Sequence, residues 1–143
     1  MALLWDLCLD GNLAGVRAAL ARGEDVNSKD GNNRTGLMCA VGQKHNSIVR
    51  LLLEQPTLDL NCSGGGFGRT ALHLAACYDN VEAVRMLLAD PRLTTANHCD
   101  WAGRTPVMAA MFQNNMDVLR ELVAHPSVDL DTRDGRSLEE WAR

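Results

Sequence analysis

The sequence predicts an all-α solenoid, in which antiparallel helix pairs stack in a row with turn-rich loops projecting between them. Three observations lead to this fold class. A basic residue followed by a hydroxyl residue recurs along the chain, two apolar patterns recur in step with it, and so do the residues that begin and end helices. Units that repeat at such an interval cannot bury an apolar face alone, so they stack on one another.

The repeat interval comes from the basic–hydroxyl pairs, which lie 35, 35 and 32 residues apart. The pairs are Arg34-Thr35, Arg69-Thr70, Arg104-Thr105 and Arg136-Ser137. They divide a single domain, residues 1–143, into units of about 1–33, 34–68, 69–103 and 104–135, with a partial C-terminal unit at 136–143. The partial unit has one predicted helix, and we expect its Trp141 to cover the apolar face of the unit before it.

Each unit begins with a first helix whose apolar residues are spaced i, i+3 and i+4, which places them on one helical face. They are Leu4/Leu7/Cys8, Leu37/Ala40/Val41, Leu72/Ala75/Ala76 and Val107/Ala110/Met111. Alanine is frequent on this face, and small side chains let neighbouring helices approach closely. The first helices are therefore expected to form a tightly packed layer.

The second helix of each unit has the same spacing, with the stripes Val16/Ala19/Leu20, Val49/Leu52/Leu53, Val84/Leu87/Leu88 and Leu119/Leu122/Val123. A candidate N-cap precedes each stripe by four residues, namely Asn12, His45, Asn80 and Asn115. An asparagine oxygen at this position accepts an otherwise unpaired backbone N–H. Gly23, Pro56, Pro91 and Pro126 are expected to end the second helices. The turn-rich segments that follow predict projecting loops or hairpins.

The segments Gly68–Ala76, Val84–Leu88, Gly103–Pro106 and Asp25–Asn27 carry a resemblance to a known family. They resemble the ankyrin repeat, and the likeness covers essentially the whole chain. The resemblance implies L-shaped units, β-hairpin fingers that project from the stack, and a concave face of fingers and first helices that binds partners. The segment Gly36–Cys39 departs from the family pattern, as does Glu139, which stands where the family has an apolar residue.

Composition limits the expected partners and location. The formal net charge of −4 at pH 7 argues against nucleic acid as the main ligand, since phosphate binding needs clustered Lys and Arg. No apolar run approaches the ~18 residues of a membrane span, and Met1–Asp6 lacks the basic leader of a secretory signal. The five cysteines form no CxxC pair, which favours a reducing compartment, the cytoplasm or the nucleus. We expect a monomer.

Three local patterns resemble sites of chemistry. Residues 66–71 match the glycine pattern of a dinucleotide site, but the βαβ unit and the later acid that such a site needs are missing, so no cofactor is expected. His73 lies where the resemblance places an imidazole that braces the backbone. His98, Cys99 and Cys62 are too few to hold a structural zinc. The sequence therefore predicts no metal and no catalysis, so the protein is not expected to be an enzyme.

Arginines recur at the repeat interval on two predicted faces. Arg34, Arg69, Arg104 and Arg136 stand at the finger bases, where an acidic partner could lie along them or local acids such as Asp30 or Asp100 could pair with them. Exposed ion pairs of the second kind are common and individually weak. Arg17, Arg50, Arg85 and Arg120 are expected on the solvated outer face of the second helices.

Four of the six aromatic residues fall on the predicted binding side. Phe67 and Trp101 lie near the finger tips, and Tyr78 and Phe112 end first helices. Aromatic side chains supply rigid anchoring area in interfaces, although these four could instead pack on the finger of the next unit. Together with Arg69 and Arg104, they are the candidate partner-binding residues.

The sequence thus predicts a protein–protein interaction module that binds a peptide or a folded partner on its concave face. Two alternatives stay open. The chain could be a scaffold fragment of a larger multidomain protein, or a regulatory substrate of an asparaginyl hydroxylase. The resemblance implies the second alternative, because asparagines at the finger bases of this family can be hydroxylated. Asn27, within Leu20–Asn27, is the nearest match.

Overall fold

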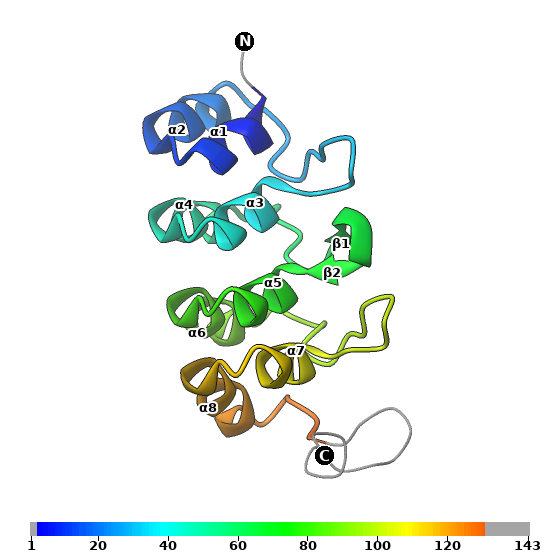
Figure 1. Cartoon of the computed structure of the whole chain (residues 1–143). Coiled ribbons are helices and arrows are strands. Elements are labelled where there is room, and N and C mark those ends of the chain that lie inside the picture. The colour runs from blue at the N-terminus through cyan, green and yellow to red at the C-terminus, as the bar shows by residue number, and fades with distance from the viewer. Residues whose placement is uncertain (1–2, 131–143) are drawn as a thin grey trace.

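A computed structural model describes residues 3–130 of the chain. Four antiparallel helix pairs stack in one row, and the loops between them project to one side (Figure 1). The first helices are α1 (Leu4–Asp10), α3 (Gly36–Gly42), α5 (Ala71–Cys77) and α7 (Pro106–Phe112), and the second helices are α2 (Leu13–Ala21), α4 (Asn46–Leu53), α6 (Val81–Ala89) and α8 (Met116–Ala124). The predicted all-α solenoid is confirmed. The expected partial unit at 136–143, with Trp141, lies outside the described residues.

The first helices pack against one another in a row, and so do the second helices. Packing is closer between first helices, as their small residues predict. Cys8, Ala40, Ala75 and Ala110 are fully buried there. Gly36 shows how tight the layer is, because a Cβ atom added at this glycine would lie 2.9 Å from the Cys8 sulfur. The expected close layer is therefore present.

The second helices bury the expected stripes, with one correction. Val49, Val84 and Leu122 are completely buried, but Val123 is 43% exposed. In α8 the buried positions are Val118 and Leu122, which are four residues apart and share one helical face. Val123 lies about 100° further around the helix, which turns it toward solvent.

Threonine caps begin three of the first helices. The hydroxyls of Thr35, Thr70 and Thr105 accept the backbone N–H groups of Met38, His73 and Met108. In the second helices, the expected cap forms at Asn12, which accepts from Gly15, and at Asn80, which accepts from Ala83. The basic–hydroxyl pairs of the sequence therefore mark where these first helices begin, since each basic residue directly precedes the capping threonine.

The cap prediction is wrong for His45 and Asn115, whose side chains make no cap bond. Asn115 instead donates its amide to the carbonyls of Ala76 and Cys77 at the end of the preceding first helix, at 2.7 and 3.2 Å. His45 lies 3.2 Å from the Leu9 carbonyl in the same way. The last carbonyls of a helix have no partner within that helix, and these side chains supply one. This position joins each unit to the one before it.

Asparagines after the second helices join each unit to the one that follows it. The Asn27 amide donates to the Thr57 carbonyl at 2.8 Å and accepts the Asp59 N–H at 2.7 Å. The same pair of bonds links Asn61 to Arg92 and Thr94, and Asn97 to Ser127 and Asp129. These side chains act as a cross-unit ladder in which both amide atoms are used.

The projecting loops are named here finger 1 (residues 28–33), finger 2 (62–68) and finger 3 (98–103). In finger 2, β1 (Ser63–Gly64) pairs antiparallel with β2 (Arg69–Thr70), which directly follows the finger, and the two strands enclose a short 3-10 turn. Finger 1 has a single bridge between Lys29 and Thr35. Fingers 1 and 3 are closed instead by buried carboxylates, Asp30 and Asp100, which accept backbone N–H groups of their own loops.

Candidate functional site

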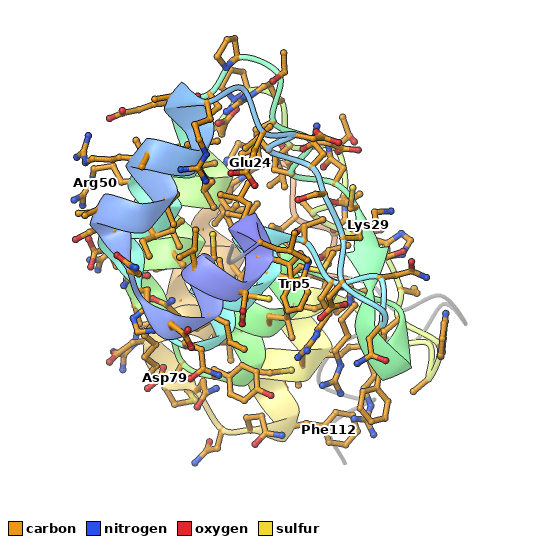
Figure 2. All side chains as sticks on the ribbon, turned by 90° about the horizontal axis from the view of Figure 1, so that it is seen from above. Trp5, Glu24, Lys29, Arg50, Asp79 and Phe112 are labelled. Carbon is orange, nitrogen blue, oxygen red and sulfur yellow. The ribbon has the colours of Figure 1, made fainter. Side chains whose placement is uncertain are left out.

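The four candidate aromatics are exposed on the finger and first-helix side of the stack. Phe67 is 62% exposed, Trp101 76%, Tyr78 52% and Phe112 51%. Figure 2 looks along the stack and shows Phe112 displaced toward the fingers, on the side away from Arg50 of α4. We call the surface of the fingers and of α1, α3, α5 and α7 the groove face. All four side chains offer most of their area to a partner there.

Adjacent fingers are joined through their backbones. The Trp101 N–H donates to the Phe67 carbonyl at 2.9 Å, and the Gly65 N–H donates to the Asn32 carbonyl at 2.8 Å. Glycine is required by this closeness, because a Cβ atom at Gly64 would lie 1.9 Å from the Asn33 carbonyl oxygen. Gly64 and Gly65, just before the residues 66–71 that match a dinucleotide pattern, thus have a packing role between fingers.

Gly68 is the second close approach between fingers. Its φ of +64° is in the left-handed region, which glycine adopts without strain. The Trp101 indole lies against it, so that an added Cβ atom would meet the indole nitrogen at 2.3 Å. One face of the exposed Trp101 ring is therefore supported by finger 2, which holds the ring in place.

Two of the finger-base arginines pair with buried carboxylates. Arg34 Nε lies 2.8 Å from Asp30 Oδ2, and Arg69 Nε lies 3.5 Å from Asp100 Oδ2. The carboxylate side chains are only 4% and 1% exposed, against 40% and 22% for their arginines. The guanidinium groups are therefore the charges that face solvent at these two places.

Hydrogen bonds from the loop backbone keep both carboxylates ionised. Burial acts to raise the pKa of Asp30, but the N–H groups of Arg34 and Asn32 outweigh it and hold this pKa below its usual value. At Asp100 burial is likewise outweighed, by the N–H groups of Arg104 and Ala102. The two carboxylates are thus fixed anchors for the finger loops.

Two arginines also stack on the candidate aromatics. The Arg69 guanidinium carbon lies 4.7 Å from the centroid of the Phe67 ring, and that of Arg104 lies 4.0 Å from the Phe112 centroid. Such cation–π contacts are worth about 0.5–1 kcal/mol at exposed sites. The structure thus brings four of the six candidate binding residues together as two arginine–aromatic pairs.

Two adjoining hollows, with volumes of about 190 and 140 Å³, lie along the first helices α3 and α5, the first beside finger 2 and the second beside α1. Arg34, Met38, Leu74 and Tyr78 line both. The first hollow is completed by the 64–67 loop and Arg69, and the second by Leu9, Cys39, Gly42 and Gln43. We call the pair of hollows the α3–α5 groove.

Family models were compared with the chain. A model for ankyrin repeats (3 copies) matches residues 4–97, and one for a single ankyrin repeat matches residues 102–135. The chain belongs to the ankyrin-repeat family. Ankyrin repeats are generally protein–protein interaction modules, and proteins built from them are typically non-catalytic. No curated protein matches the chain.

His73 of this ankyrin-repeat chain has a structural role. It is fully buried; its Nδ1 lies 3.2 Å from the Thr70 backbone nitrogen, and its Nε2 lies 2.8 Å from the Arg104 carbonyl. Burial is the main cause that lowers its pKa, so the neutral ring is favoured. The bracing role that the resemblance implied matches this geometry, and the ring links finger 3 to α5.

Asn27 is placed at the base of finger 1, where both atoms of its amide bridge to the next unit. Hydroxylation at this residue stays a prediction. An enzyme that acts on Asn27 must first break the hydrogen bonds that its side chain makes with Thr57 and Asp59. Among residues 3–130, no three His, Cys, Asp or Glu side chains gather as metal ligands, and no helix there is long and apolar enough to cross a membrane.

Sequence reasoning did not select Met38, Leu74 or Gly42, which form the floor and wall of the groove. The residue type alone identifies the aromatic and charged candidates, whereas the groove depends on the absence of a side chain at Gly42. Gly42 occupies the place that Leu9, Cys77 and Phe112 hold in the other three first helices. The available signal was a glycine at a repeat position that carries Leu, Cys and Phe in the other three units.

Proposed function

We propose that this ankyrin-repeat chain binds a protein partner through its groove face, with Phe67, Tyr78, Trp101 and Phe112 as the main anchors. The single observation that carries the proposal is that all four aromatic side chains are more than half exposed and lie on the same side of the stack. Large aromatic side chains dominate interface energetics. None of the four belongs to the apolar core of the described residues.

The remaining features of the groove face support this proposal. Trp101 rests on Gly68, and Arg69 and Arg104 stack on Phe67 and Phe112. Side chains that are already held in one geometry lose less entropy when a partner binds. The opposite face carries the exposed residues Arg50, Arg85 and Arg120 and lacks such supported aromatic side chains among the described residues.

Affinity capture from an extract of the source cells tests the proposal. The wild-type chain is compared with a Phe67→Ala/Trp101→Ala double variant and, as a matched control, with an Arg85→Ala/Arg120→Ala variant of the outer face. We expect the groove-face variant to lose the main partner and the control to keep it. Trp101→Ala alone should weaken the purified complex by ~2 kcal/mol or more, with little change in melting temperature.

Two results would reject the proposed face. One is a partner that binds the groove-face variant normally and fails to bind the outer-face variant. The other is a Trp101→Ala protein that melts much earlier than wild type yet binds normally, since that residue would then serve stability. Circular dichroism of each variant establishes that the helices are intact before binding is compared.

A further inference from the structure

The α3–α5 groove combines an apolar floor with two guanidinium groups at its edge. Met38 is buried and Leu74 is half-buried at the floor, while Arg34 lines both hollows and Arg69 the first. A cavity of ~150 Å³ lined by apolar side chains holds a molecule of the size of benzene. Each hollow therefore accommodates one apolar side chain, and neither approaches the ~300 Å³ at which sites for drug-sized ligands begin.

The charges at this edge are arranged to meet an anion from outside. Both carboxylates that pair with the arginines are almost fully buried and are held by backbone N–H groups of their own loops. Arg34 and Arg69 use only Nε toward these carboxylates, and their terminal nitrogens donate no hydrogen bond to a described residue. Those nitrogens are geometrically suited to a bidentate carboxylate.

We propose that the α3–α5 groove binds an extended peptide segment in which an apolar side chain fills the second hollow and an adjacent Asp or Glu reaches Arg34 and Arg69 at the first. The proposal rests on the proposed function and makes its partner class more specific. Gly42 is what leaves the second hollow open, since a Cβ atom added there lies 3.9 Å from the Tyr78 ring. A larger side chain at this position fills the space that the peptide needs.

Random peptides displayed on phage are selected against the purified full chain, and the strongest is synthesised with a fluorescent label for anisotropy titration. We expect the selected sequences to share an apolar residue next to an Asp or Glu. Arg34→Gln should weaken binding by about tenfold or more, the effect of losing one charged hydrogen bond. Arg120→Gln, which removes the same charge from the outer face, should change it less than twofold.

Two further comparisons make the assignment residue-specific. Replacing the peptide acid by its amide should cost less in the Arg34→Gln variant than in the wild type, because interacting groups give non-additive effects in a double-mutant cycle. Gly42→Leu should abolish binding, whereas Gly42→Ala, which adds one methyl group, should leave most of it. Circular dichroism and melting curves check that each variant is folded.

The proposal is overturned if no peptide is enriched, if the enriched peptides lack an acidic residue, or if Arg34→Gln and Arg120→Gln lose affinity equally. These outcomes leave the proposed function intact as long as the Phe67→Ala/Trp101→Ala variant still loses its cellular partner. If the Phe67→Ala/Trp101→Ala variant keeps its cellular partner while the selected peptides show a clear apolar–acidic preference, the aromatic anchors are rejected and the groove proposal stands.

Discussion

Two rows of arginines, one at the fingers and one on the outer face, share the same repeat spacing in the sequence but lie in different environments in the structure. On the outer face, Arg50 pairs with Glu82 and Arg85 with Glu121 of the following unit, and these glutamates are 52% and 33% exposed. At the fingers, the partner carboxylates of Arg34 and Arg69 are 4% and 1% exposed. The spacing of the arginines is similar, but the burial of their partners is not.

The difference teaches that the carboxylate, and not the arginine, decides what such a pair does. An exposed glutamate pairs weakly and leaves no net charge at the surface. A buried aspartate that accepts backbone N–H groups fixes a loop and leaves the guanidinium as the group that solvent or a partner meets. The following predictions test this contrast, in order of expected effect.

The largest effect is expected from Asp100→Ala. This change removes the acceptor of the Ala102 and Arg104 N–H groups and of Arg69 Nε. Lost charged hydrogen bonds and unpaired buried donors cost about 2–3 kcal/mol together, which urea unfolding at an unchanged m value measures. Asp100→Asn keeps an acceptor oxygen and should cost less. A loss below about 0.5 kcal/mol for the alanine variant would place this carboxylate in the same class as the outer-face glutamates.

Two alanine substitutions in α3 should have opposite signs. Gly36→Ala places a Cβ atom 2.9 Å from the buried Cys8 sulfur, and overpacking of this kind typically costs ~1–3 kcal/mol. Gly42→Ala faces the open groove and should gain about 0.5 kcal/mol from the better helix propensity of alanine. Thermal melting of the two variants beside wild type measures both. Equal destabilisation would mean that the groove wall is packed like the interior.

Acid should weaken the link between finger 3 and α5 through His73. Its pKa is lowered in the folded chain, mainly by burial, so the unfolded chain binds the proton more tightly. The stability that this residue contributes is complete above about pH 6.5 and falls as the pH drops from there toward the lowered folded pKa, by at most ~1.4 kcal/mol per pH unit, and it falls no further below the folded pKa. The melting temperature should therefore fall by a few degrees between pH 7 and pH 5.

His73→Ala is the control for this pH effect. It should be less stable than wild type at pH 7, because Arg104 and Thr70 lose a buried partner, yet its melting temperature should change less between pH 7 and pH 5. Asp30 and Asp100 add their own loss only below about pH 4, since their folded pKa values lie below 3.8. A wild-type curve that is flat down to pH 5 would contradict the assignment to His73.

The smallest effect is expected on the outer face. Glu121→Ala removes the 2.8 Å pair with Arg85, and exposed pairs of this type contribute about 0.2–1 kcal/mol. The difference from wild type should disappear in ~1 M salt, where screening acts within about 3 Å. Asp100→Ala measured in the same salt should keep most of its effect. A salt-resistant loss at Glu121 would show that burial of the partner is not the deciding property.

Most of the fold follows from the spacing of apolar residues, because a helix that stacks on identical neighbours must repeat its buried face. The i, i+3, i+4 stripes therefore place all eight helices of residues 3–130, with an error only at Val123. The roles of His45 and Asn115 were not readable from local pattern, since one polar residue at this place can accept a cap bond, make a cross-unit bond, or do both, as Asn80 does. The carbonyls that His45 and Asn115 reach belong to the preceding unit, which the local pattern does not show.

The candidate site was partly readable for a similar reason. Aromatics at turn and helix-end positions have no apolar stripe to join, so exposure of Phe67 and Trp101 could be predicted. The α3–α5 groove could not, because a hollow is defined by what surrounds Gly42 in three dimensions, including Leu74 and Tyr78 from the next unit. Which acid each arginine pairs with likewise depends on how the loops close. Asp30 and Asp100 reach Arg34 and Arg69 only once their loops are formed.

The cross-unit bonds have a consequence for how such a chain can change length. Asn61 reaches forward to the loop at Arg92 and Thr94, while Asn80 of the next unit reaches back to the Val41 carbonyl. A unit thus carries one side chain for the neighbour on each side. When a whole unit is duplicated or deleted in the gene, the new junction brings together the same two reaching side chains and the same receiving backbone groups. The hydrogen bonds between units are therefore compatible with lengthening of the protein by duplication of whole units.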